Sequence, residues 1–107
     1  MVKLTILYKK PESTQAFDEH YQNVHMPIVY KMPGLKKSEI AKVTGSPMGE
    51  SPYYVITELY FDSLADLQTA LSSEAGRASA KDVNNFAKGL AEMFISEVEK
   101  VPAGFKA

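Results

Sequence analysis

The sequence contains no cysteine and carries a net charge of only −1. Without cysteine the chain has no disulfide, no thiolate nucleophile and no thiolate metal ligand. The charge balance lacks the basic excess that nucleic-acid binding requires, so we expect no nucleic-acid partner. No apolar run reaches membrane-spanning length, and residues 1–6 are too short and too polar for a signal peptide. We therefore expect a cytoplasmic protein that has no membrane partner.

The motifs of several enzyme classes are missing as well. We find no glycine-rich loop for a dinucleotide or a phosphate, no HExxH pair and no serine in a nucleophile elbow. The only two histidines, His20 and His25, are five residues apart, which is about 140° around an ordinary α-helix. Such a pair does not easily bind one metal ion, so we expect no metal site and no other cofactor.

The length and composition indicate one globular domain over residues 1–107. Hydrophobic residues make up 45% of the chain and charged residues 23%, which is ordinary for a globular protein. A chain of this size buries a real core but encloses only a small cavity by itself. A sizeable ligand pocket would therefore need loops or a second chain.

Hydrophobic periodicity predicts four strands and two helical regions, with Pro, Gly and Ser clusters between them. The order is β-α-β-β-α-β, which is the ferredoxin-like arrangement of the α+β class. It predicts a four-stranded antiparallel sheet with its helices on one face. The expected segments are strand 2–8, helix 13–31, strand 35–44, loop 45–52, strand 53–61, helix 64–71, helix 75–88, strand 91–101 and an irregular tail 102–107. The loop is either a lid over a site or a plain connection.

The strand Tyr53–Phe61 is apolar on both of its faces. One layer of helices covers only one face of a sheet, and an exposed apolar face would associate with other apolar surfaces. We therefore expect a homodimer whose interface includes this strand. Glu58, in the middle of it, must be paired, hydrogen-bonded or neutral. It is either a functional carboxylate or the partner of a lysine in a salt bridge.

The first helical region concentrates the candidate chemistry. Its apolar stripe consists of Phe17, Tyr21, Val24 and Ile28 at helical spacing, and the two histidines lie on the shoulders of that stripe. An imidazole that is half-buried there has a pKa that is easily tuned near neutral pH. Pro27 removes one backbone donor, so we expect an interrupted hydrogen bond directly after His25.

The candidates for proton transfer are His25 and Glu58, and His20 is a lesser candidate whose role the pattern does not define. Each has a plain structural alternative, as a packed histidine or as half of a salt bridge. Aromatic side chains with apolar bodies are suited to line a ligand pocket, although core packing is the commoner role of such side chains. We take as ligand-binding candidates Tyr8, Phe17, Tyr21, Tyr60 and Phe86.

Several short motifs, in this order, resemble the EthD family over nearly the whole chain. They are Phe17-x-x-x-Tyr21-x-x-x-His25-x-Pro27, Met32-Pro33-Gly34-Leu35, the stretch from Thr57 to Leu64, Ser73-Glu74 and Asn85-Phe86-Ala87. The resemblance implies a dimeric α+β barrel with a pocket between each sheet and its helices. EthD-like proteins are associated with degradation of ethyl tert-butyl ether, and most have no assigned reaction. The same superfamily includes small monooxygenases, muconolactone isomerases and haem-handling proteins.

The resemblance transfers to His25 and Pro27, and less directly to Tyr21 and Glu58. It predicts a homodimer that binds a small, mostly apolar organic molecule. An enzyme of this kind would perform cofactor-free proton transfer or oxygenation, with His25 as base or acid and Glu58 or a tyrosine orienting it. The alternatives are a non-catalytic binding or accessory protein, and a haem-binding relative with a histidine as axial ligand.

Overall fold

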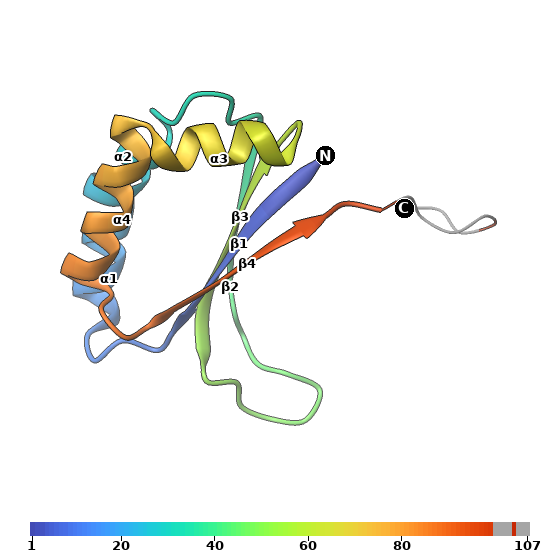
Figure 1. Cartoon of the computed structure of the whole chain (residues 1–107). Coiled ribbons are helices and arrows are strands. Elements are labelled where there is room, and N and C mark those ends of the chain that lie inside the picture. The colour runs from blue at the N-terminus through green and yellow to red at the C-terminus, as the bar shows by residue number, and fades with distance from the viewer. Residues whose placement is uncertain (100–103, 105–107) are drawn as a thin grey trace.

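The protein folds into one antiparallel sheet of four strands with all its helices on one face (Figure 1). The computed structural model describes residues 1–99 and 104. The strand order is β2-β3-β1-β4, with β1 (Val2–Lys9), β2 (Lys37–Lys42), β3 (Tyr53–Phe61) and β4 (Ala91–Glu97). This confirms the predicted α+β, ferredoxin-like fold. The last predicted strand ends earlier than expected, and its residues 100–101 and most of the predicted tail lie outside the described residues.

Alternation along the two central strands gives the sheet one helix-covered face. Side chains of β1 point alternately into and away from the core, and those of β3 do the same beside it. The buried set consists of Val2, Leu4, Ile6 and Tyr8 from β1 with Val55, Thr57, Leu59 and Phe61 from β3. The core therefore lies between these two strands and the helices.

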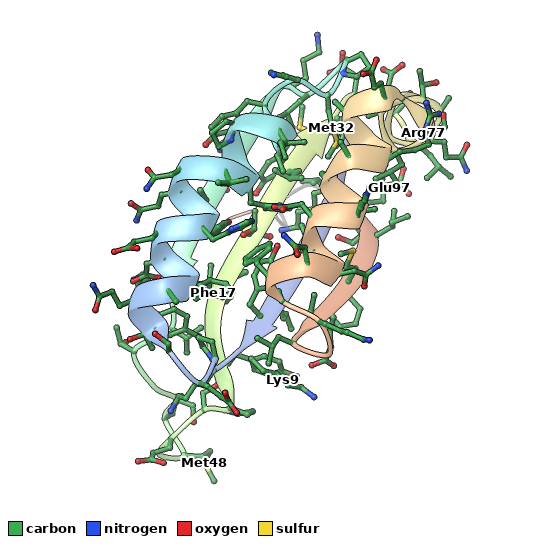
Figure 2. The ribbon with its side chains drawn as sticks, turned by 90° about the vertical axis from the view of Figure 1, so that its left-hand side faces the viewer. Lys9, Phe17, Met32, Met48, Arg77 and Glu97 are labelled. Atoms are coloured by element: carbon green, nitrogen blue, oxygen red, sulfur yellow. The ribbon has the colours of Figure 1, made fainter. Side chains whose placement is uncertain are left out.

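Serine caps define where the helices begin. Ser13 caps α1 (Thr14–His20), and Ser63 caps α3 (Leu64–Ser72). Ser73 follows α3 and caps α4 (Glu74–Phe86), as its position in the sequence predicts. The first helical region continues from α1 through the π-helical turn η1 (Tyr21–His25) into α2 (Met26–Val29). It runs side by side with α4 over the sheet, with Phe17 at its lower end in Figure 2.

The π-turn η1 changes which residues of the first helical region face the core. Pro27 has no backbone N–H, so the regular ladder of hydrogen bonds has to break near it. The helix takes an extra residue into the preceding turn, where the N–H of Met26 donates to the carbonyl of Tyr21. As a result Val24 is 43% exposed and His25 only 3%. The predictions that Val24 packs in the core and that His25 is half-buried are therefore wrong.

A bulge at the start of β3 moves another side chain. Tyr8 pairs with Val55 and Lys9 with Tyr53, so Tyr54 is the extra residue. Its hydroxyl donates to Asp18 of α1 at 3.0 Å, which places Tyr54 on the helix side rather than on the opposite face as simple alternation predicts.

The loop of residues 45–52, which connects β2 to β3, projects beyond the sheet and away from the helices (Figure 1). At its tip Met48 is 95% exposed. This position fits a connection between two strands better than a lid over the helix-covered face. In the described part of the chain, every helix is too short or too polar to cross a bilayer.

Candidate functional site

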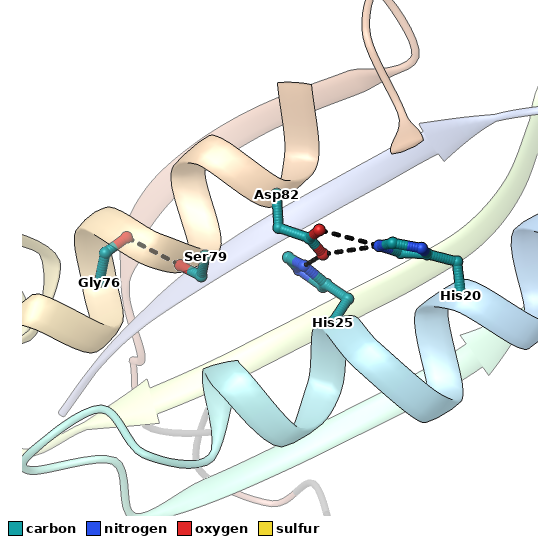
Figure 3. A network of polar contacts seen from close by, with 5 residues as sticks. All are labelled: His20, His25, Gly76, Ser79 and Asp82. Carbon is teal, nitrogen blue, oxygen red and sulfur yellow. Dashed lines mark hydrogen bonds and ion pairs between the residues drawn. The ribbon is translucent and has the colours of Figure 1, made fainter. Parts of the chain in front are cut away.

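Asp82 of α4 lies between the two histidines and contacts both (Figure 3). Nε2 of His20 is 2.8 Å from Oδ1 and 3.0 Å from Oδ2 of the carboxylate. Nδ1 of His25 is 2.9 Å from Oδ2. Asp82 is 9% exposed, so this is a cluster of two imidazoles on one nearly buried carboxylate.

The π-turn is what brings both imidazoles to the same carboxylate. Residues five apart diverge on an α-helix, whereas a turn with hydrogen bonds five residues apart aligns them on one face. Across from this face, α4 buries Gly76, Ser79 and Asp82. The Ser79 hydroxyl is satisfied locally, since it donates to the carbonyl of Gly76 at 2.9 Å (Figure 3). Asp82 is thus left to face the first helical region.

Burial and hydrogen bonding set the charge states of this cluster. Burial lowers the pKa of His25 below its ordinary value, although the hydrogen bond to Asp82 acts in the opposite direction. Burial by itself would raise the pKa of Asp82, but the contacts with His20 and His25 outweigh it and lower that pKa. At neutral pH we assign a neutral His25 whose Nδ1–H donates to the Asp82 carboxylate. Its Nε2 then carries a lone pair, which is the arrangement of a general base.

His25 also lines a small cavity between the sheet and the helices, with a volume of about 60 Å³. Tyr8 lines the same cavity from β1, and burial raises the pKa of its hydroxyl, so Tyr8 is a neutral phenol. Leu71 and Met93 contribute to the lining and are 37% and 48% exposed, which marks the side on which the cavity approaches the surface. The cavity is therefore lined by a neutral imidazole and a neutral phenol among mostly apolar side chains.

Three further aromatic candidates pack around this cluster. The Tyr21 hydroxyl is hydrogen-bonded to Thr57, and burial raises the pKa of Tyr21 to about 12 although that bond opposes the rise. Phe86 stacks on His20 with ring centroids 4.8 Å apart and lies 4.9 Å from the His25 ring. Phe17 packs against Phe86 at 5.3 Å. These rings hold the imidazoles in place, and none of the three is among the residues that line the cavity.

His20 faces a different space. An open groove of about 610 Å³ runs past it and is lined by Phe17, Phe86, Lys10 and Lys88 among others. The His20 side chain is 26% exposed there. The cluster therefore touches an internal cavity through His25 and an outer groove through His20.

Two predicted site residues lie far from the cluster, on the helix-free face of the sheet. Glu58 forms an ion pair with Lys3 at 2.5 Å, and Tyr60 donates to Glu39 at 2.6 Å. Alternation along β3 turns Glu58 and Tyr60 away from the helices while Thr57 turns toward them. The prediction that Glu58 orients His25 is therefore wrong, and Asp82 does so instead.

The sequence reasoning missed Asp82, although α4 carried a signal for it. Ser79, Asp82, Val83 and Phe86 are spaced so that they share one helical face. A carboxylate on the same face as Val83 and Phe86 must find a partner when that face is buried. Within residues 1–99 and 104, no group of three or more His, Asp or Glu side chains is arranged to hold a metal ion.

Comparison with known families and proteins gives consistent matches. The model of the EthD domain matches residues 9–90, which is more than half of the chain. An uncharacterized 11.0 kDa protein of Rhodococcus erythropolis, from the thcB–thcC intergenic region, is 36% identical over 101 residues. That alignment covers 94% of this chain and 98% of the relative.

Solved structures match the fold. An EthD family protein from Bacillus halodurans C-125 superposes with a TM-score of 0.90 at 46% identity, covering 92% of this chain and 99% of that one. SnoaB, a cofactor-independent oxygenase from Streptomyces nogalater, matches with a TM-score of 0.71 at 8% identity, covering 95% and 96%. A dimeric ferredoxin-like protein of unknown function from Thermobifida fusca YX matches with 0.69 at 12%, covering 91% and 90%. The last two similarities concern the fold alone.

Proposed function

This chain belongs to the EthD family, and we propose that it binds a small, mostly apolar organic molecule beside His25 and transfers a proton to or from it. The observation that carries the proposal is a neutral imidazole whose Nδ1 is 2.9 Å from a buried carboxylate, at the wall of an apolar cavity. Surface histidines do not need such a partner, and a buried one that has it is positioned to accept a proton.

In this mechanism Nε2 of His25 takes a proton from an acidic C–H or O–H group of the ligand. The Asp82 carboxylate stabilises the imidazolium that forms, as in other carboxylate–imidazole pairs. Tyr8, a neutral phenol at the same cavity, donates a hydrogen bond to the anion that the ligand becomes. Return of the proton to another atom gives an isomerisation, and reaction of the anion with dioxygen gives an oxygenation. The cofactor-independent oxygenase SnoaB supports the second route by its fold alone.

The size of the cavity restricts the ligand. The cavity has a volume of about 60 Å³, so in this conformation it holds only a few water-sized groups. A larger ligand would have to displace the exposed side chains of Leu71 and Met93 at the mouth. This favours a small molecule and disfavours the haem-binding alternative. A cytoplasmic location, expected from the lack of cysteine, is part of the same proposal.

We also propose a homodimer that is formed through the helix-free face of the sheet. That face carries Leu7, Ile56 and Phe94 beside the ion pair of Lys3 and Glu58, and Phe94 is 51% exposed in the single chain. An exposed sheet face of this composition favours association with another apolar surface. The Thermobifida fusca protein described as dimeric supports the same assembly at the level of the fold.

Light scattering on a size-exclusion column at micromolar concentration tests the assembly. The expected mass is twice that of the 11.8 kDa chain. A measured mass equal to that of one chain would contradict the dimer, and with it the α+β barrel that two chains would form.

A thermal-shift screen of small, weakly acidic aromatic and apolar compounds tests the proposed function, with His25→Gln as the decisive variant. Glutamine keeps a donor for Asp82 but has no base. For compounds that stabilise the wild type, affinity should fall about tenfold in His25→Gln, which is roughly 1.4 kcal/mol. Any turnover should fall by at least about 100-fold, the ordinary contribution of a general base.

Val24→Ala is the matched control, because Val24 precedes His25 on the same turn and is exposed. It should bind the same compounds as the wild type does. If His25→Gln keeps full affinity and turnover while its urea midpoint falls, His25 is a structural residue and the proposed function is wrong.

A further inference from the structure

His20 has no role in the proton transfer described above, yet it contacts the same carboxylate twice. Its Nε2 lies 2.8 Å from Oδ1 and 3.0 Å from Oδ2 of Asp82, so Oδ2 is shared with His25. We propose that His20 is a positioning residue. It holds the Asp82 carboxylate in the rotamer that orients His25, and it shares the negative charge of that carboxylate with His25. The effect of His20 on turnover, through His25, rests on the proposed function.

The carboxylate needs a second partner because of where it lies. Asp82 extends from α4 toward the other helical region and is 9% exposed, so little water reaches it. With His25 as its only partner, Oδ1 would lack a donor and the carboxylate would be free to rotate about its side-chain bonds. His20 supplies that donor, and stacking on Phe86, with an interplanar angle of 21°, fixes the plane of its ring.

The two imidazoles compete for one negative charge. A positive charge on His20 opposes protonation of His25, whereas the Asp82 carboxylate favours it. The other titratable groups beside His25 are Tyr21 on its own turn and Tyr8 across the cavity on β1, both neutral phenols. The basicity of His25 therefore depends on Asp82 and His20. Among His25, Asp82 and His20, it is His20 that borders the outer groove, which Lys10 and Lys88 also line.

The test is an NMR titration of the His25 imidazole in the ligand-free protein, comparing the wild type with His20→Phe and His20→Gln. Phenylalanine keeps the stacking on Phe86 but removes both the donor and the competing charge. The His25 titration midpoint should then rise by at least about 0.3 pH unit, a twofold gain in proton affinity. Glutamine also removes the charge but restores a donor that holds Asp82 beside His25, so the His25 midpoint in His20→Gln should be at least as high as in His20→Phe.

Glu12→Gln is the control, since Glu12 lines the same groove as His20 and lies outside the network around Asp82. An unchanged or lowered midpoint in His20→Phe would overturn the inference. If His20→Phe does not fold, an unchanged His25 midpoint in His20→Gln would likewise overturn the inference, because glutamine also removes the competing charge. A raised midpoint together with full ligand affinity in His25→Gln would contradict the proposed function and leave the role of His20 intact.

Discussion

Replacement of Asp82 by alanine is expected to destabilise the protein by about 2 kcal/mol, because it leaves the buried His25 donor without an acceptor. The contacts that disappear join Asp82 of α4 to His20 and His25 of the first helical region, so their loss also loosens the packing between these two regions. Urea denaturation at neutral pH measures the change in the free energy of unfolding.

Asp82→Asn separates the geometry of the cluster from its charge. The amide keeps one acceptor oxygen for His25 and presents its NH₂ group to His20, so we expect about half the loss of stability seen with alanine. The exposed ion pair of Asp62 and Lys36 offers the control. Asp62→Ala should change stability by no more than about 0.5 kcal/mol. An Asp82→Ala variant as stable as this control would show that the cluster contributes nothing to the fold.

Gly76→Ala is expected to cost about 3 kcal/mol, which is at the upper end for overpacking of a core. Gly76 lies in the first turn of α4, pressed against the last turn of α3. An added Cβ would overlap the carbonyl oxygen of Ala70 and lie 2.5 Å from that of Leu71. Both are backbone atoms, so relief requires α4 to move as a whole, and Asp82 moves with it.

The unfolding free energy and the binding of any compound from the screen should therefore fall together in Gly76→Ala. Ala78→Ser is the control, since Ala78 lies two residues further along α4 and is exposed. It should stay within about 0.5 kcal/mol of the wild type. A Gly76→Ala variant as stable as this control would mean that the two helices do not meet as closely as described.

Local signals were sufficient for most of the fold. The alternation in β1 and β3 and the serine caps Ser63 and Ser73 are short-range patterns, and the elements they predict lie where expected. Prediction from the sequence erred at Val24 and at Tyr54. A π-turn and a β-bulge each add one residue and change the phase of the side chains that follow, which a regular period cannot anticipate.

The candidate site was only half predictable for a related reason. His25 was found because it stands in a local motif before Pro27. Its partner Asp82 lies 57 positions further along the chain, and only packing brings the two together. Glu58 drew attention as a carboxylate in an apolar strand, but its strand position turns it toward Lys3 on the other face. On an ideal α-helix the side chains of His20 and His25 would point in different directions, whereas the π-turn directs both to the Asp82 carboxylate.

Nitrogen NMR of the His25 imidazole in the ligand-free protein shows directly whether His25 is a neutral base held by Asp82. At neutral pH Nδ1 should carry the proton and Nε2 should be unprotonated. The ring should titrate at a pH below that of a free histidine, because burial lowers its pKa, and lower still in Asp82→Asn, which removes the group that favours the charged form. An imidazolium at neutral pH, a proton on Nε2, or a titration that Asp82→Asn leaves unchanged would contradict the assignment of His25 as a neutral base held by Asp82.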